Sequence, residues 1–398
     1  MKILIFYHKL SERNGGPPTY LYNLRKSILK NNLSIDFLSD YLNDEKVVYS
    51  SIRNLKIKFV GGLNPNLVAL YQIYKLNKRN EYNYLDKIKL DKYDIIHFHS
   101  TFDLYKYYPY LKKNYSGKII LTTHSPKAYH LEYIEDVLKT SVGKIWNNVF
   151  KKLLAIDEFA FKNADALVFP CEEALEPYFN TWKNFSEIIK NKKIGYFLTS
   201  SPEASVKKDN IQIRESLNIP NDAFVIVYAG RHNYVKGYDL LKEIAQNILE
   251  NEKIKDVYFL ILGKEEPICG LKNSRWIEVG WTSDPHSYIS AGNLFILPNR
   301  ETFFDLILIE VLSLGKLLLL SETGGNRFFS NYKDSGIFFF KKENVNDAVN
   351  KINFIASKSK LENSFLEKIN FDIYNKYFLL DDFALNYLEC VKKITAYD

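Results

Sequence analysis

The residues best suited to chemistry lie in two short stretches of the second half of the chain. In residues 231–237, Arg231 and Lys236 follow an apolar run. Arginine offers a planar bidentate fork and lysine a mobile point charge, a pairing suited to a diphosphate; two surface cations at a loop are the alternative. The second stretch holds Glu310, a lone carboxylate in an apolar segment. Because burying an unpaired carboxylate costs several kcal/mol, we expect it to meet backbone groups or the hydroxyl groups of a ligand.

Apolar runs beside these residues predict the elements that position them. Residues 223–230, 294–297 and 317–320 are almost entirely apolar, which is typical of strands buried on both faces of a parallel sheet. The segment 305–314 has helical length and ends before Gly315, a suitable residue for a helix C′ position. Both chemical stretches are therefore expected at the carboxyl ends of strands, where α/β sheets bind ligands.

Strands and helices alternate along the whole chain, which predicts doubly wound α/β domains. Further strands are expected at residues 2–7, 34–38, 56–59, 94–99, 118–123, 164–170, 256–263, 276–279 and 336–340. Helical patterns include residues 19–29, 125–163, 344–357 and 378–395. A chain of 398 residues exceeds what one core normally serves, and the polar segment 199–210 is the best linker candidate. We expect a domain boundary near residue 200.

The loop after the first predicted strand contains a glycine pair, Gly15 and Gly16, ahead of a helix expected to start near Pro18. Such a pair lets a phosphate approach backbone N–H groups at the positive end of a helix. An ordinary turn is the alternative, and the loop lacks the GxGxxG spacing of dinucleotide-binding folds.

Three histidines lie at or just past the ends of two predicted strands: His97, His99 and His124. A buried imidazole with satisfied hydrogen bonds is the expected role of His97. His124 ends the string Leu-Thr-Thr-His, to which the resemblance below gives a further role.

The motifs together resemble those of retaining GT-B glycosyltransferases of family 4, also called glycosyl transferases group 1. The resemblance covers nearly the whole chain. The matching residues are Pro298, Glu301, Phe304, Glu310, Gly315 and the turn Thr323-Gly324-Gly325, then Gly230-Arg231 with Lys236-Gly237, the Thr122-x-His124 segment, and the loop at Gly15 and Gly16.

This resemblance implies a role for each matching residue. Arg231 and Lys236 would offset charge on a leaving diphosphate, Glu310 would accept hydrogen bonds from the ribose of a nucleotide sugar, and His124 would lie against the donor sugar. Gly15 and Gly16 would face the donor phosphates and the acceptor. The remaining expected donor contacts are Glu301, Thr302, Phe304, Asp305 and Leu306.

The chain departs from the family pattern at three places. Eight residues separate Glu301 from Glu310 where the family has seven, so either Glu301 or Thr302 contacts the sugar. Asp305 stands where the family usually has glycine. An Asn-Gly-x-Asp turn is missing, and residues 194–197 stand about where it would be.

The fold implied by the resemblance is GT-B, with two doubly wound Rossmann-like domains facing one another across a cleft. The expected domains are an acceptor-side domain over 1–200, a nucleotide-sugar domain over 201–375 and a C-terminal helical segment over 376–398 that returns to the first domain. Residues 378, 379, 383, 387 and 391 have the spacing of a docking face.

The implied activity is retaining transfer of a hexosyl unit from a nucleoside diphosphate sugar, with uridine as the commonest donor base of the family. Capsule, cell-wall, lipid-linked and protein-linked glycans are all open as acceptors. No metal or other cofactor is expected, because no Asp-x-Asp motif lies at a suitable place. Two alternatives are a sugar-nucleotide epimerase of the same fold and a non-catalytic partner subunit of another glycosyltransferase.

Charge, cysteine content and the lengths of apolar segments bear on where the protein acts and on what it binds. The formal charge is +7, and residues 53–92 hold nine Lys/Arg against three Asp/Glu. A solvated basic face and peripheral contact with an anionic membrane are both open, whereas no nucleic-acid-binding module is recognisable. Three widely spaced cysteines imply no disulfide framework or zinc site. Without a signal peptide or a long apolar segment, the protein is expected to be cytoplasmic.

Overall fold

A computed structural model describes residues 1–12, 15–42, 70–71, 74, 85, 88–138, 144–251, 253–265 and 267–396, with side chains left out at 134–138 and 144–145. The strand predicted at 56–59 and most of the basic stretch 53–92 lie outside the described residues.

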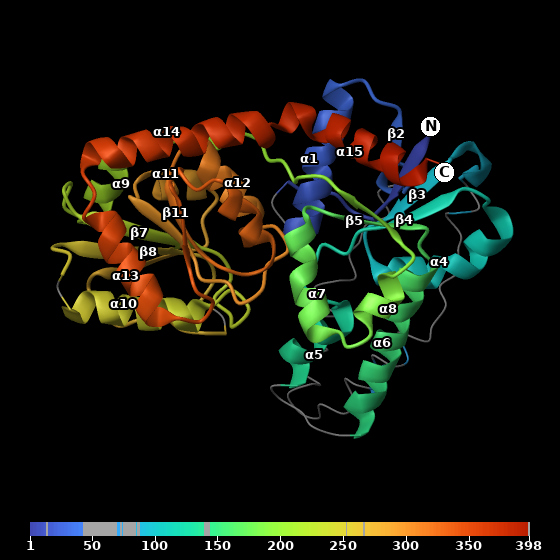
Figure 1. Ribbon diagram of the computed structural model, residues 1–398, viewed down its shortest axis with the longest axis horizontal. Helices are drawn as coiled ribbons and strands as arrows, with labels where there is room; N and C mark the ends of the chain where they lie inside the picture. The colour runs from blue at the N-terminus through green and yellow to red at the C-terminus, as the bar shows by residue number, and fades with distance from the viewer. Residues whose placement is uncertain are drawn as a thin grey trace. The chain divides into compact units, whose positions relative to one another are not determined.

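The chain forms two compact units, each built on one parallel sheet (Figure 1). Unit 1 comprises residues 1–169, 178–197 and 387–398, and unit 2 comprises residues 170–177 and 198–386. Each sheet has six strands, in the order β2-β1-β3-β4-β5-β6 in unit 1 and β12-β11-β10-β7-β8-β9 in unit 2. The predicted α/β class with two doubly wound domains is confirmed.

Unit 1 alternates strands with helices. Its strands are β1 (Ile3–Phe6), β2 (Ile35–Phe37), β3 (Ile95–Phe98), β4 (Lys118–Leu121), β5 (Ala166–Phe169) and β6 (Lys193–Tyr196). The helices of this part of the chain are α1 (Gly16–Lys30), η1 (Leu38–Asp40), η3 (Leu90–Lys92), α4 (Thr101–Asn114), α5 (Tyr129–Leu138), α6 (Lys144–Asn163), η4 (Glu172–Leu175), α7 (Glu176–Thr181) and α8 (Phe185–Ile189).

Unit 2 repeats the alternation. Its strands are β7 (Phe224–Ala229), β8 (Val257–Leu262), β9 (Trp276–Gly280), β10 (Leu294–Leu297), β11 (Leu317–Ser321) and β12 (Ile337–Phe340). The helices are α9 (Asn210–Ser216), α10 (Tyr238–Asn251), α11 (Pro285–Ser290), α12 (Leu306–Ser313), η5 (Gly324–Asn331), α13 (Val345–Ala356), α14 (Lys360–Tyr377) and α15 (Leu380–Thr395), which ends in unit 1.

Alternate residues of the unit 2 strands fill a core against α10 and α13. Ile226, Phe259 and Ile296 belong to this cluster, and their neighbours along each strand are buried on the other face. Side chains of a strand alternate between faces, so burial on both faces explains why these strands have no polar alternation. On a different part of the unit, α14 packs against α12 (Figure 1).

Every strand predicted within the described residues is present, whereas several elements had no predicted range, among them one strand and a long helix. The strand β6 was not predicted, because only Gly195 in it is fully buried and the sequence has no apolar run. The helix α14 was also not predicted, although it carries a capping box formed by Ser359 and Glu362. Its helical pattern is weak because few of its residues are buried.

Candidate active site

The strand order of unit 2 contains a topological switch point between β7 and β10. From β7 the chain proceeds to β8 and β9 on one side, and from β10 it proceeds to β11 and β12 on the other. In open α/β sheets, ligands bind beyond the carboxyl ends of strands at such a point. The loop with Arg231 and Lys236 follows β7, and the loop leading to Glu310 follows β10. Both segments therefore start at the switch point.

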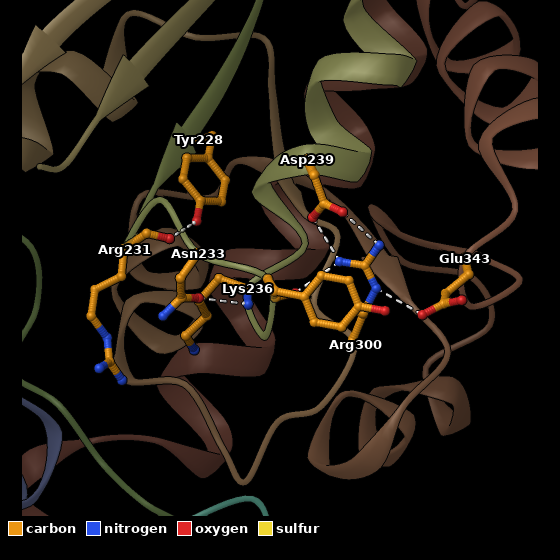
Figure 2. A network of polar contacts seen from close by, with 8 residues as sticks. Tyr228, Arg231, Asn233, Lys236, Asp239, Arg300 and Glu343 are labelled. Atoms are coloured by element: carbon orange, nitrogen blue, oxygen red, sulfur yellow. Dashed lines mark hydrogen bonds and ion pairs between the residues drawn. The ribbon is translucent and has the colours of Figure 1, made fainter. Parts of the chain in front are cut away.

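The loop after β7 has a defined conformation. The Tyr228 hydroxyl donates a hydrogen bond of 2.8 Å to the Arg231 carbonyl, and the Lys236 backbone N–H donates one of 3.0 Å to Asn233 Oδ1 (Figure 2). Gly237 then adopts φ +64°, a left-handed conformation that favours glycine. A Cβ at Gly237 would lie 1.9 Å from the carbonyl oxygen of Pro298. The loops after β7 and β10 therefore touch at a position that admits no side chain.

An ion pair joins these two loops next to that contact. Lys236 Nζ lies 2.7 and 2.8 Å from the two carboxylate oxygens of Asp305, and Asn299 Nδ2 donates to Asp305 Oδ2 at 2.6 Å. Arg231, on the same loop, is exposed. The aspartate that replaces the family glycine thus neutralises one of the two cations expected to bind the diphosphate.

Arg300 also joins the loops after β7 and β10, and it was not among the residues expected from the sequence. Its backbone N–H donates to the Val235 carbonyl at 2.9 Å, and its guanidinium lies 3.6 Å from the centre of the Tyr234 ring. The guanidinium also donates to both carboxylate oxygens of Asp239, at 2.7 and 2.9 Å, and to Glu343 at 2.7 Å (Figure 2). No spacing pattern signals this network, because its members come from three segments far apart in the sequence.

Electrostatics support Arg300 and Asp239 as a stable ion pair. Burial opposes ionisation of Asp239, but hydrogen bonds and charge from Arg300 outweigh burial and lower the pKa of this carboxyl below its usual value. The same pairing raises the pKa of Arg300 against the effect of its own burial. Bidentate arginine pairs of this kind hold geometry as well as charge, so Arg300 fixes the loop that carries Lys236.

Glu310 lies on α12 and has a polar partner. Its Oε2 is 3.0 Å from His286 Nε2 on α11, and its side chain is 21% exposed. We expected a backbone group or a ligand at this carboxylate, and its partner in the structure is a histidine. The signal that could have found His286 is its place just beyond a predicted strand, where chemical groups of α/β sheets gather.

Residues 301–306, which lead from the loop after β10 into α12, include both buried and half-buried side chains. Thr302 is 1% exposed, and Phe304 packs its ring against Phe329 at 5.6 Å between centres. Glu301 and Leu306, like Asp305, are half-buried. The Thr302 carbonyl accepts a hydrogen bond of 3.2 Å from the Gly325 N–H, so the Thr-Gly-Gly turn supports the loop through its backbone.

Unit 1 has its own switch point between β1 and β3. Gly15 caps α1 with φ +93°, and a Cβ at Gly15 or Gly16 would meet no atom of the described residues within 4 Å. The helix begins at Gly16, with Pro17 and Pro18 in its first turn. The glycine pair therefore adjoins open space at the amino end of a helix on the ligand edge of this sheet.

Three imidazoles stand side by side at the ends of β3 and β4. His97 hydrogen-bonds both to the Tyr387 hydroxyl and to Thr122 Oγ1 at 2.9 Å, as expected of a buried, satisfied histidine. His99 Nδ1 lies 2.7 Å from His124 Nε2. Burial lowers the pKa of His97 and of His124 to about 3, so both imidazoles are neutral near pH 7 and act as hydrogen-bonding groups.

The expected site residues thus fall on both units. Gly15, Gly16 and His124 belong to unit 1, and Arg231, Lys236, Glu301, Thr302, Phe304, Asp305, Leu306 and Glu310 belong to unit 2. Within the described ranges, no group of three or more His, Cys, Asp or Glu side chains is arranged to hold a metal ion.

Comparison with known proteins relates most of unit 2 to one family. Residues 209–370 match the family Glycosyl transferases group 1, a range that contains both loops at the switch point. This match and the two six-stranded parallel sheets support a group 1 glycosyltransferase with the GT-B fold. Among solved structures, it resembles sucrose-phosphate synthase from Thermosynechococcus elongatus, with a TM-score of 0.66 and 16% identity over 99% of this chain and 98% of that one.

Other relatives of this glycosyltransferase are distant in sequence. HepE of Anabaena, solved with UDP-glucose, has a TM-score of 0.64 and 14% identity over 99% of this chain and all of that one (100%). The UDP-Gal:alpha-D-GlcNAc-diphosphoundecaprenol alpha-1,3-galactosyltransferase of Escherichia coli is 22% identical, over 79% of this chain and 76% of its own length. The O-antigen biosynthesis glycosyltransferase WclY of Escherichia coli is 23% identical, over 61% of this chain and 64% of its own length.

One further property concerns membranes. Among the residues that the structure describes, no helix combines the length and the apolar character that crossing a bilayer requires.

Proposed function

We propose that this glycosyltransferase moves a hexosyl unit from a UDP-sugar to a glycan acceptor, with retention of configuration, in the biosynthesis of a cell-surface polysaccharide. The observation that carries the proposal is the switch point of unit 2, where Arg231 and Lys236 follow β7 and Glu310 lies on the helix that follows the adjacent strand β10. A diphosphate needs cations and a ribose needs a hydrogen-bond acceptor. This edge of the sheet offers both within the range that matches the family.

The proposed reaction requires positive charge beside the departing diphosphate. The bond between the anomeric carbon and the diphosphate oxygen breaks, and the acceptor hydroxyl oxygen bonds to the anomeric carbon on the same face. The acceptor proton passes to the departing phosphate. Negative charge grows on the diphosphate in the transition state, so Arg231 and Lys236 stabilise it more strongly than they stabilise the bound donor. His124 contributes a neutral hydrogen-bonding group beside the sugar, and no metal or other cofactor takes part.

The proposed donor and acceptor are inferred from proteins that this chain resembles. The Escherichia coli galactosyltransferase named above uses UDP-Gal and a diphosphoundecaprenol-linked acceptor, and the HepE structure contains UDP-glucose. We propose by analogy a UDP-sugar donor and a lipid-linked glycan acceptor, reached by peripheral contact of a cytoplasmic protein with the membrane. Capsule and protein-linked glycans are the other acceptors to be tried.

The test combines binding and turnover. Thermal unfolding of the full chain is followed with UDP, GDP, ADP and CMP, and then with the sugars of the nucleotide that binds. A bound donor raises the melting temperature by mass action, and we expect UDP-sugars to do so. Product is then analysed by NMR for its anomeric configuration. The proposal is wrong if no nucleotide raises the melting temperature, or if a donor yields an epimerised nucleotide sugar without any acceptor.

Asp305 provides a quantitative prediction for the donor site. Its charge offsets that of Lys236 across 2.7 Å, so Asp305→Asn frees that cation for a diphosphate. We expect UDP to bind about fivefold more tightly to Asp305→Asn, from an ion pair worth up to about 1 kcal/mol at partial exposure. Titration calorimetry at low and high salt measures the change, which salt should reduce.

Asp372→Asn is the matched control, because it removes the same charge from an exposed position on α14. It should leave UDP affinity unchanged. Equal or weaker binding of UDP by Asp305→Asn than by the unmodified protein would show that Asp305 does not compete for Lys236.

A further inference from the structure

A short backbone segment of unit 2 is held by side chains of α11 and α12, the helices that carry His286 and Glu310. This segment, residues 204–208, donates four backbone hydrogen bonds. The bonds run from Ala204 N–H to Ser313 Oγ at 3.0 Å, from Ser205 N–H to His286 Nδ1 at 3.1 Å, and from the Lys207 and Lys208 N–H groups to Ser287 Oγ at 2.9 and 3.0 Å. Ser313 lies on α12, and His286 and Ser287 lie on α11.

These bonds determine the tautomer of His286. A backbone N–H can only donate, so His286 Nδ1 must be the acceptor of the bond from Ser205. A neutral imidazole with an acceptor at Nδ1 carries its proton on Nε2. His286 Nε2 therefore donates to Glu310 Oε2 across 3.0 Å. The backbone at Ser205 thus directs an N–H group at the carboxylate of Glu310.

A carboxylate held in this way presents its remaining acceptor sites in a fixed direction. Among the described residues, Glu310 Oε1 accepts no hydrogen bond, while Oε2 accepts the one from His286. A free glutamate side chain loses rotamer freedom when it binds a ligand, which weakens binding. A carboxylate that is already oriented avoids that loss.

We propose that His286 is a positioning residue for ribose recognition, which acts by orienting Glu310 under the control of residues 204–208. The inference rests on the proposed function, in which Glu310 accepts hydrogen bonds from the ribose hydroxyls of the donor. It adds a specificity determinant on α11: selection of ribose over deoxyribose depends on an imidazole that never touches the nucleotide.

The experiment compares the affinities of UDP and 2′-deoxy-UDP in the full chain by titration calorimetry. The unmodified protein is expected to prefer UDP, and His286→Ala should lower that preference about five- to tenfold, within the range of the net contribution of one typical hydrogen bond. His286→Gln should restore part of the preference, because its amide can accept from Ser205 and donate to Glu310.

Two further variants separate positioning from simple structural support. Ser287→Ala removes two other hydrogen bonds to the same segment without touching Glu310, so it should lower the melting temperature but keep the preference for UDP. The double variant His286→Ala with Glu310→Ala should show the same preference as Glu310→Ala alone, because His286 acts only through that carboxylate.

The outcomes that overturn the inference are distinct from those that overturn the proposed function. If the unmodified protein binds no nucleoside diphosphate, the proposed function fails and the inference fails with it. If UDP binds and His286→Ala keeps the full preference for ribose, only the inference fails. The inference also fails if Ser287→Ala lowers the preference as much as His286→Ala, since that result would indicate a purely structural role.

Discussion

Lys236→Ala is expected to lower kcat by about two to three orders of magnitude, the size of effect seen when one preorganised donor to developing charge is removed. The Lys236 ammonium lies at the switch point of unit 2, at the place where the proposed diphosphate departs. Charge on the diphosphate increases in the transition state, so the loss should appear mainly in kcat. A discontinuous assay of UDP release with acceptor measures it.

Lys255→Ala is the matched control for that variant. Lys255 is an exposed lysine that precedes β8, so it lies at the amino ends of the strands of the same sheet. Its substitution changes the net charge of the unit by the same amount. It should keep full turnover. Near-normal kcat in Lys236→Ala would remove Lys236 from the chemistry, whatever the control shows. Because Lys236→Ala also leaves Asp305 without its cation, the double variant with Asp305→Asn should recover UDP affinity but not kcat.

Gly237→Ala is expected to destabilise unit 2 by about 3 kcal/mol. Left-handed backbone costs a residue with a Cβ about 1–2 kcal/mol, and the Pro298 carbonyl oxygen would lie 1.9 Å from the new atom. Relief requires the loops after β7 and β10 to separate, at an overpacking cost of about 1–3 kcal/mol. Urea unfolding measures the loss, and reduced UDP affinity should accompany it because Lys236 is the preceding residue.

Gly280→Ala isolates the contact from the backbone strain. Gly280 also has positive φ, at +77°, but a Cβ there meets nothing within 4 Å. Its substitution should cost only the conformational part, about 1–2 kcal/mol. Equal destabilisation by the two substitutions would mean that the contact between Gly237 and Pro298 is easily relaxed.

The fold was largely predictable because its strands are buried on both faces. Continuous apolar runs such as 223–230 and 317–320 have few structural solutions, and the structure has β7 and β11 at these places. Prediction failed where burial is one-sided. The edge strand β6 is largely exposed apart from Gly195, whose Cβ position adjoins Cys390 and Ile394 on the distant helix α15. The helix α14 is mostly solvated, so its periodicity is weak.

The candidate site was predictable where residue type and spacing within one segment carry the chemistry. Arg231, Lys236 and Glu310 could be singled out because each follows or interrupts an apolar run. The spacing of Glu301 and Thr302 did not settle which of them faces the sugar. The structure adds that the Thr302 side chain is buried and Glu301 is half-buried.

By itself, the sequence determined most of the order of strands and helices. It also determined that two cations and a carboxylate lie in the segments that follow two strands, because these features depend on local patterns of burial and charge. Only the tertiary structure decided how those groups are held. Asp305 pairs with Lys236, Arg300 stacks on Tyr234, and His286 orients Glu310. Each pair joins residues far apart in sequence, and their meeting depends on which strands lie side by side in the sheet, a property that no single segment encodes.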